Sequence, residues 1–384
     1  MPKAAIRLGL FSGSDEPVSL PPEAGDISIH CYPNEVPSFV GPELESLYDN
    51  LYSSLAQFTI NGTLDAASTY LARRGGRIVA LFLFRQERHR VRVLNEIIHV
   101  DGEEIERFAE YLFAGRPEVS VISFHGIDTG TRKWRRPVQR FNCLEDIVLT
   151  LPGTEAEYQG RLGKTTRRNM KRYLSRMERD FPSFQYELCA GSTLDEADIR
   201  SIIDFNKARM ANKRQVSNFD EREAAQIVAR VKACGRVGII RIEGCICAGA
   251  ISYRVGDNYF LGVLAHDPAF DPYRPGLLCC YLTICQAIRD GGREFHFLWG
   301  RYEFKYLLLG VQRDLDALTV YRSRAHQLLH WKAVIGNLSS DYGRRFRLWL
   351  QELRHRNGRV ARMLLNPARQ LQGFLKGRGY FSKR

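Results

Sequence analysis

Residues 271–278, DPYRPGLL, have the composition of a binding site for a phosphate group. An apolar run typical of a helix begins at Gly276, and free backbone N–H groups at a helix start attract anions. Arg274 places a cation just ahead of that start, Gly276 allows a close approach, and no carboxylate follows in the first turn. This pattern is compatible with a bound pyrophosphate. The residues expected to bind it are Arg274, Gly276, Leu277 and Leu278.

A second stretch, residues 295–306, could supply groups that transfer protons. A histidine titrates near neutral pH, which makes His296 the most interesting of these groups. Strict alternation along a strand would place His296 on the face opposite Phe295 and Phe297. A hydrogen-bonded histidine of the core or the surface is the alternative. The other titratable side chains near this position are His266, Asp267, Tyr302, Glu303 and Tyr306.

The elements that must position these residues follow from apolar periodicity. Turns at residues 243–244 and 256–257 should join three strands into an antiparallel meander. The predicted order is α-α-β-β-β-α-β-α-β. The predicted elements are helices 194–212 and 220–233, strands 236–242, 246–254 and 257–264, helix 276–290, strand 294–298, a short helix near 302–309 and strand 315–322.

The N-terminal half repeats most of this order, which suggests a duplicated fold. Its helix start at residues 101–106, DGEEIE, carries carboxylates that cap the helix but repel an anion. We therefore expect the first half to be a scaffold or an acceptor-binding surface. Its predicted elements are helix 43–56, strands 68–73, 77–84 and 90–98, helix 103–114 and strands 119–124 and 143–150.

Three motifs resemble those of one family. Residues 295–305, FHFLWGRYEFK, resemble the F-D-F-L-x-G-D/E-x-x-Y-K segment of the CelD/BcsL-like GNAT acetyltransferases, which are distant relatives of the two-domain FemABX aminoacyl-transferases. Tyr273 and the following P-G-L-L resemble the cofactor loop of that family. The basic helix 161–179 resembles its K-x-R-x-N-x-x-R helix, so the resemblance covers about residues 160–322.

The motif near Lys305 also departs from the family. His296 stands where the family usually has Asp, Arg301 where it often has an acid, and Phe304 where it often has Tyr. Gly300 and Lys305 match. The departures point to a different acceptor, a different mechanism or a lost activity.

The resemblance implies an acyl-CoA that lies between the fourth and fifth strands, 257–264 and 294–298. Backbone N–H groups at Gly262, Val263 and Leu264 would polarise the thioester carbonyl. Lys305 would hold an anionic acceptor or a phosphate, or pair with Glu303. The residues expected to act in catalysis are His296, Tyr302, Glu303 and Lys305.

No metal site is expected, because the nine cysteines form no C-x-x-C pair and lack partners at ligand spacing. We expect reduced, structural thiols. Cys285 lies in a predicted helix without a visible base, which argues against nucleophilic catalysis.

The positive charge of the chain lies at its C-terminal end. The net charge is +13, and from Arg322 onward 15 Lys or Arg face only Asp341 and Glu352, so the tail accounts for the whole excess. Apolar residues recur there at helical spacing, which predicts an amphipathic helix suited to an anionic membrane surface or packed on the protein itself. The stripe consists of Phe346, Trp349, Leu350 and Leu353, extended by Val360, Met363 and Leu364.

The basic helix 161–179 has a solvated face or binds an anionic acceptor or phospholipid head groups. Binding of RNA by stacking would require aromatic residues among the charges, and the helix offers mainly Tyr173. Nucleic acid is therefore not expected as a partner.

The sequence thus predicts a mixed α/β (α+β) protein of tandem GNAT-like domains, each a mainly antiparallel sheet flanked by helices. These are a degenerate domain at 1–155, an acyltransferase domain at 156–325 and a basic helical tail at 326–384. No signal peptide or spanning segment is evident, so we expect a cytoplasmic protein whose tail touches the inner membrane.

The leading functional hypothesis is an acyl-CoA-dependent N-acyltransferase that acts on an amino sugar or a lipid or polysaccharide precursor in cell-envelope biosynthesis. One alternative is a FemABX-like transferase that depends on aminoacyl-tRNA. The other is a catalytically inactive, membrane-associated binding protein.

Overall fold

A computed structural model describes residues 27–130, 133–212, 220–331 and 334–336. The chain divides into a compact unit, Met1–His326, and a second unit, Gln327–Arg384. The amphipathic helix predicted around residues 346–364 lies outside the described residues.

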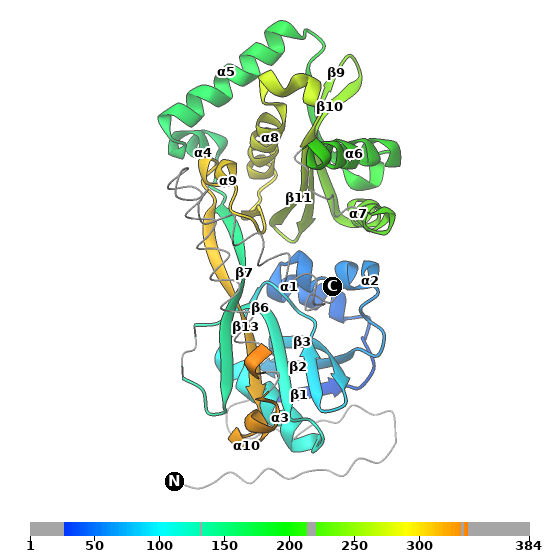
Figure 1. The fold of residues 1–384 in the computed structure, drawn as a ribbon, viewed down its shortest axis with the longest axis vertical. Coiled ribbons are helices and arrows are strands. Elements are labelled where there is room, and N and C mark those ends of the chain that lie inside the picture. The colour runs from blue at the N-terminus through cyan, green and yellow to red at the C-terminus, as the bar shows by residue number, and fades with distance from the viewer. Residues whose placement is uncertain (1–26, 131–132, 213–219, 332–333, 337–384) are drawn as a thin grey trace, which may run out of the picture. The chain divides into compact units, whose positions relative to one another are not determined.

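The first half contains a sheet flanked by helices (Figure 1). Its elements are β1 Ile27–Tyr32, α1 Val40–Tyr48, α2 Leu55–Ile60, β2 Ser68–Arg74, β3 Arg77–Glu87, β4 Arg90–Val93, β5 Ile98–His99, α3 Gly102–Gly115, β6 Val121–Asp128 and β7 Val138–Thr150.

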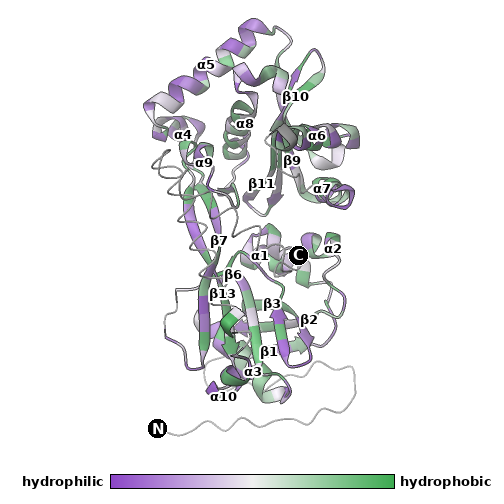
Figure 2. Ribbon diagram, in the orientation of Figure 1, coloured by the Kyte–Doolittle hydropathy of each residue, from purple (hydrophilic) through white to green (hydrophobic). Residues whose placement is uncertain are grey.

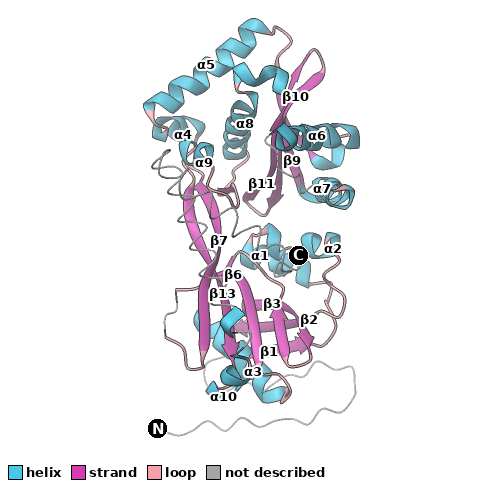
Figure 3. Ribbon diagram, viewed as in Figure 1, coloured by secondary structure: helices cyan, strands magenta, loops and turns pink. Residues whose placement is uncertain are grey.

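The second half follows the predicted order, with an additional strand before its two long helices (Figure 3). Its elements are α4 Glu155–Arg161, α5 Lys164–Asp180, β8 Gln185–Ala190, α6 Glu196–Asn212, α7 Glu221–Cys234, β9 Gly235–Ile242, β10 Cys245–Val255, β11 Asn258–His266, α8 Pro275–Arg289, β12 Glu294–His296, α9 Glu303–Leu307, β13 Val311–Tyr321 and α10 Arg324–Leu329.

The predicted fold class is confirmed, because most strand pairs are antiparallel and helices flank the sheet. The described strands form one continuous sheet in the order β1-β2-β3-β4-β6-β13-β7-β12-β11-β10-β9-β8, with β5 beside β6. The parallel pairs are β4 with β6, β5 with β6, and β11 with β12.

The two halves share their last strands. β13, from the second half, lies between β6 and β7 of the first half. β7 in turn extends past β13 to pair with β12, where Val148 lies opposite His296. Figure 1 shows β7 and β13 side by side along this connection. The predicted boundary near residue 155 follows directly after β7, and the division into two domains stays a prediction.

Two predicted elements of the first half are interrupted. The helix expected at 43–56 is α1 and α2, because Asp49 adopts a left-handed conformation (φ 48°) that ends α1. Ser54 then caps α2 by accepting a hydrogen bond from the N–H of Gln57 at 3.3 Å. The strand expected at 90–98 is divided into β4 and β5. In the helix, short capping residues thus overrode the apolar periodicity.

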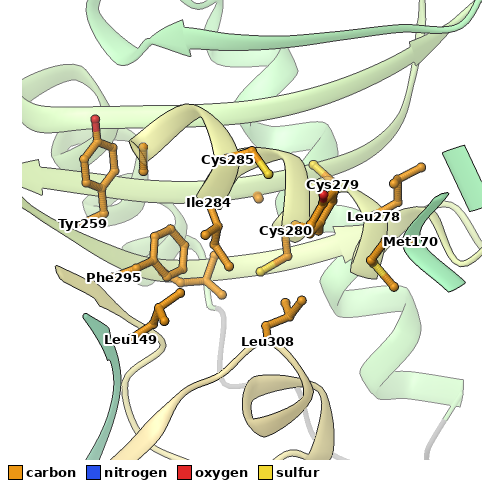
Figure 4. Close-up of a cluster of buried hydrophobic side chains, with 14 of the residues drawn as sticks. Leu149, Met170, Tyr259, Leu278, Cys279, Cys280, Ile284, Cys285, Phe295 and Leu308 are labelled. Carbon is orange, nitrogen blue, oxygen red and sulfur yellow. The ribbon is translucent and has the colours of Figure 1, made fainter. Parts of the chain in front are cut away.

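Helices cover both faces of the sheet in the second half. Tyr259 and Leu261 of β11 join a core with α8, α5 and α4, whereas Phe260 and Val263 join a core with α6 and α7. Figure 4 shows Cys280 and Ile284 of α8 packed in the first of these cores together with Phe295 of β12. Figure 2 shows α8 as largely hydrophobic and α5 as largely hydrophilic. The face of the sheet that a β11 residue points to therefore decides which helices it meets.

All nine cysteines are free in the structure. No helix among the described residues is long and apolar enough to cross a bilayer. The described residues contain no group of three or more His, Cys, Asp or Glu side chains that could hold a metal ion.

Candidate functional site

The sheet opens between β11 and β12. The two strands pair only at residues 258–260 with 294–296. Beyond His296 the chain follows β7 instead, since the N–H of Phe297 donates to the carbonyl oxygen of Ile147 at 2.7 Å. Residues 261–266 of β11 therefore pair with β10 on one side and have no strand partner on the other within the described chain.

A bulge at Gly262 accompanies this opening. Ile251 pairs with Val263 and Ser252 with Leu261, which leaves Gly262 as the extra residue of β11. A Cβ atom at Gly262 would lie 2.6 Å from Cε2 of Tyr253, so only glycine fits without a shift. Bulges of this kind redirect a strand and are common beside active sites.

A cavity of about 580 Å³ lies at the open edge of β11. It is bounded by β11, the start of α8, the inner face of α5, the end of α6 and α9. Its lining residues are Thr165, Thr166, Asn169, Met170, Tyr173, Arg209, Leu264, His266, Asp271, Arg274, Gly276, Leu277, Glu303, Phe304 and Leu307.

The start of α8 forms one end of this cavity. Arg274 is the N-cap in a left-handed conformation (φ 55°), and no side chain caps the helix. Its carbonyl oxygen accepts from the N–H of Leu278 at 3.1 Å, so the N–H groups of Gly276 and Leu277 are the ones without an intrahelical acceptor. Gly276, Leu277 and Arg274 line the cavity, whereas Leu278 is fully buried in the core.

Gly276 lies against a histidine that sequence reasoning had only noted. A Cβ atom at Gly276 would lie 2.8 Å from Nδ1 of His266. Nε2 of His266 lies 2.7 Å from Oδ1 of Asp271, which fixes the ring at the cavity wall. A larger side chain at position 276 would displace this ring and close the approach to the helix start.

The inner face of α5 forms a polar wall. Asn169 and Tyr173 line the cavity from this helix together with Thr165 and Thr166. The cations that suggested the basic-helix motif do not line the cavity. They are exposed on α5 and comprise Lys164, Arg167, Arg168, Lys171 and Arg172.

One further cation of α5 holds the loop that precedes α8. The guanidinium of Arg176 lies 4.3 Å from the ring centroid of Tyr273 and donates to the carbonyl oxygen of Pro272 at 3.3 Å. The hydroxyl of Tyr273 donates to Asp180 at 3.1 Å. Tyr273, which the sequence motif singles out, therefore anchors the loop to α5 rather than reaching into the cavity.

Arg209 enters the cavity from α6 and was missed by sequence reasoning. Its Nε atom is shielded from solvent and has no hydrogen-bond partner among the described residues. A buried polar group without a partner costs about 1–3 kcal/mol, and more when it is charged. No sequence signal distinguishes this residue from the other arginines near it.

His296 lies outside the cavity lining, in a network of buried charges. Its Nδ1 lies 2.6 Å from Oδ2 of Asp146 on β7, and its Nε2 lies 3.3 Å from Oε2 of Glu294. Glu294 is also bound by both terminal nitrogens of Arg313, at 2.9 and 2.6 Å. The ring of His296 stacks on Phe260 with centroids 4.4 Å apart, so it faces the α6 side of the sheet.

This network shifts the protonation of its members. Burial alone would lower the pKa of His296, but the carboxylates of Asp146 and Glu294 outweigh burial and raise it. Burial would raise the pKa of Glu294, but the adjacent His296 and the hydrogen bonds from Arg313 lower it to about 2. The raised pKa favours the cationic form of His296 between two carboxylates, which suits a structural junction between β7, β12 and β13.

Lys305 is also buried and also lies outside the cavity lining. Its ammonium donates to the carbonyl oxygens of Phe297, Leu298 and Trp299, at 2.8, 3.1 and 2.6 Å. Burial lowers the pKa of Lys305 to about 8. All three of these hydrogen bonds stabilise the turn by which the chain leaves the edge of β11. Within this turn Leu298 has a left-handed φ of 59°.

The remaining residues of the motif lie around α9. Glu303 and Phe304 line the cavity. Tyr302 is exposed, and its ring stacks on Phe304 with centroids 6.3 Å apart. Of the four residues expected in catalysis, Glu303 lines the cavity. Tyr302 stacks on Phe304, which also lines the cavity, whereas His296 and Lys305 lie outside the cavity lining.

Residues 164–306 match the family model of an acetyltransferase (GNAT) domain. The match covers α5, the open strand β11, the start of α8 and the turn held by Lys305. It supports an N-acetyltransferase in general terms, and the CelD/BcsL-like family stays a resemblance. No curated protein matches the chain.

The fold of both halves is similar to that of solved structures. The crystal structure of FemX is 9% identical with a TM-score of 0.57, and the match covers 77% of this chain and 98% of FemX. A conserved protein of unknown function from Bacteroides thetaiotaomicron VPI-5482 is 11% identical with a TM-score of 0.49, over 74% and 96%. A tandem GNAT protein from the clavulanic acid biosynthesis pathway is 12% identical with a TM-score of 0.38, over 76% and 98%. At this sequence identity, the similarity to FemX is a similarity of fold.

The first half lacks the open edge of the GNAT domain. Where β4 leaves β6, residues 94–100 close the gap: the N–H of Ile97 donates to the carbonyl of Gly126 at 2.7 Å, and β5 pairs with β6. The side chain of Asn95 accepts from the N–H of Leu83 at 2.8 Å. Asp101 caps α3 by accepting from the N–H of Glu103 at 3.2 Å. The position equivalent to the gap between β11 and β12 is thus filled by the chain itself.

Proposed function

We propose that the GNAT domain binds an acyl-CoA in the cavity and transfers its acyl group to an amine. The observation that carries this proposal is the continuity between the acid-free start of α8 and the unpaired edge of β11 within one cavity. The N–H groups of Gly276 and Leu277, with the Arg274 guanidinium, would hold the pyrophosphate. The pantetheine arm would then run along the free edge of β11.

The chemistry fits the groups at that edge. Backbone N–H groups at Gly262, Val263 and Leu264 would polarise the thioester carbonyl. The amine attacks the carbonyl carbon, a C–N bond forms, the C–S bond breaks and CoA leaves as its thiolate, which takes a proton from water. Glu303, which reaches the cavity from α9, would take the proton that the amine loses. His296 and Lys305 would act by positioning β12 and the turn after it.

We propose further that the acceptor is an amino sugar or a lipid or polysaccharide precursor used in envelope assembly. The resemblance of residues 295–305 to the CelD/BcsL-like motif supports this. The exposed cations of α5 offer a surface for anionic head groups close to the cavity. Contact of the C-terminal tail with the inner membrane is part of the same proposal.

A second candidate function is an aminoacyl-tRNA-dependent transferase. The FemX-like fold over both halves, together with the cations of α5, favours it. Binding of tRNA that weakens steeply with salt, without any affinity for CoA, would support this candidate over the first.

Calorimetric titration with acetyl-CoA tests the proposal. Arg274→Asn removes the guanidinium, and asparagine tolerates the left-handed conformation of this position. A hydrogen bond to a charged group contributes about 1.5–3 kcal/mol, so affinity should fall about 10–150-fold. Arg274→Lys keeps the charge and is the matched control. Absence of binding by the wild type, or equal binding by Arg274→Asn, would remove the proposal.

A further inference from the structure

We propose that Arg209 binds an anionic group, a phosphate or a carboxylate, on the acceptor amine. The proposal rests on the function proposed above and names the class of its second substrate. The acceptor would approach from the α6 side of the sheet and the acyl-CoA from the α8 side.

The position of Arg209 supports the approach of the two substrates from opposite faces of the sheet. α6 and α7 cover the face of the sheet that carries Phe260 and Val263, whereas α8 and α5 cover the opposite face. Arg209, from the last turn of α6, nevertheless lines the same cavity as Gly276 and Leu277 of α8. A continuous sheet would separate these residues. The cavity therefore passes the unpaired edge of β11 and reaches both faces.

Asp271 and Glu303 line the same cavity as Arg209, but among the described residues no ion pair joins Arg209 to either of them. The Nε atom of Arg209 is buried and has no hydrogen-bond partner among the described residues. Two arginines elsewhere on this half are paired: Arg200 binds Glu196 and Glu221, and Arg241 binds Glu187 and Asp198. A guanidinium is always charged and forms paired hydrogen bonds with carboxylate or phosphate. A ligand anion would supply the partner that Nε lacks among the described residues.

Binding of the acyl-CoA does not require Arg209. The pyrophosphate is served by Arg274 and the start of α8, and these groups belong to the other face of the sheet. An anion at Arg209 could still come from either substrate, from a phosphate of CoA or from the acceptor. Two measurements separate these sources.

The first measurement is the affinity for CoA of Arg209→Gln, compared with Arg200→Gln as the matched control on the same helix. We expect both variants to bind CoA within about twofold of the wild type, because the donor site is intact. A loss of about tenfold or more in Arg209→Gln alone would assign this residue to the donor and overturn the proposal.

The second measurement is the melting temperature with saturating CoA, with and without inorganic phosphate, at an ionic strength matched by chloride. Phosphate should raise the melting temperature of the wild type and Arg200→Gln, and leave Arg209→Gln unchanged. An equal rise in Arg209→Gln, or no rise in the wild type, would overturn the proposal. If the wild type does not bind CoA, the proposed function fails, and the response to phosphate alone still tests Arg209.

Discussion

His296 should act as one partner of a buried ion pair, and replacing it with phenylalanine tests this role. Phenylalanine preserves an aromatic ring against Phe260 but removes the imidazolium 2.6 Å from Asp146. The side chain of Asp146 is 4% exposed, and its Oδ1 atom has no hydrogen-bond partner among the described residues. His296→Phe would therefore leave a buried carboxylate without its cation.

The cost follows from this geometry. Breaking a buried pair by removing one partner costs about 3–5 kcal/mol, whereas replacing both partners with apolar residues is often close to neutral. In urea unfolding at about pH 6, the free energy of unfolding of His296→Phe should fall by about 3–5 kcal/mol. The double variant His296→Phe/Asp146→Leu should recover most of that loss.

The pH dependence gives an independent readout. The raised pKa of His296 means that its contribution to stability is full below about pH 6.5 and is lost as pH rises through the folded-state pKa. The lowered pKa of Glu294 means that its contribution is full above about pH 4.5 and is lost as pH falls toward about 2. The wild type should lose stability above about pH 6.5, and the double variant should lack this loss.

Two results would refute this reasoning. A loss below about 1 kcal/mol in His296→Phe, with an unchanged pH profile, would mean that the pair is not ionised. A double variant with recovered stability and normal acyl-CoA binding but no acyl transfer would return His296 to the catalytic role expected from the sequence.

Three other substitutions test the site. Lys305→Met removes three carbonyl hydrogen bonds, so urea unfolding should show a loss of about 1–3 kcal/mol, and unchanged stability would contradict its positioning role. Gly276→Val should push against His266, 2.8 Å from the added Cβ, and weaken acyl-CoA binding at least about tenfold in calorimetry; undiminished affinity would place the cofactor elsewhere. Glu303→Gln should slow turnover by about 10²–10⁴ without changing acyl-CoA affinity, and an unaltered rate would remove it as the base.

Much of the second half could be predicted from the sequence. Long apolar periods and glycine turns placed α8, β10 and β11 within a few residues of their bounds. The acid-free start at Gly276 was visible because the N-terminal residues of a helix are contiguous in sequence. The opening of the sheet was expected from the resemblance, and the structure attributes it to the turn held by Lys305 and to the path of the chain along β7.

What the sequence could not predict depends on contacts between distant segments. Asp146 lies 150 positions from His296, so nothing near the histidine indicated that a carboxylate would hold it as a cation. The exchange of β7 and β13 between the halves is likewise a pairing of distant strands. Arg209 acquires its place only because the sheet is open at β11, and sequence periodicity carries no information on that opening.

The most direct test of the central claim is a crystal structure of the protein with acetyl-CoA. The account predicts the pyrophosphate within hydrogen-bond distance of the N–H groups of Gly276 and Leu277, and the thioester beside Leu264 at the unpaired edge of β11. Acetyl-CoA bound in the first half, or bound in the second half away from the start of α8, would contradict it.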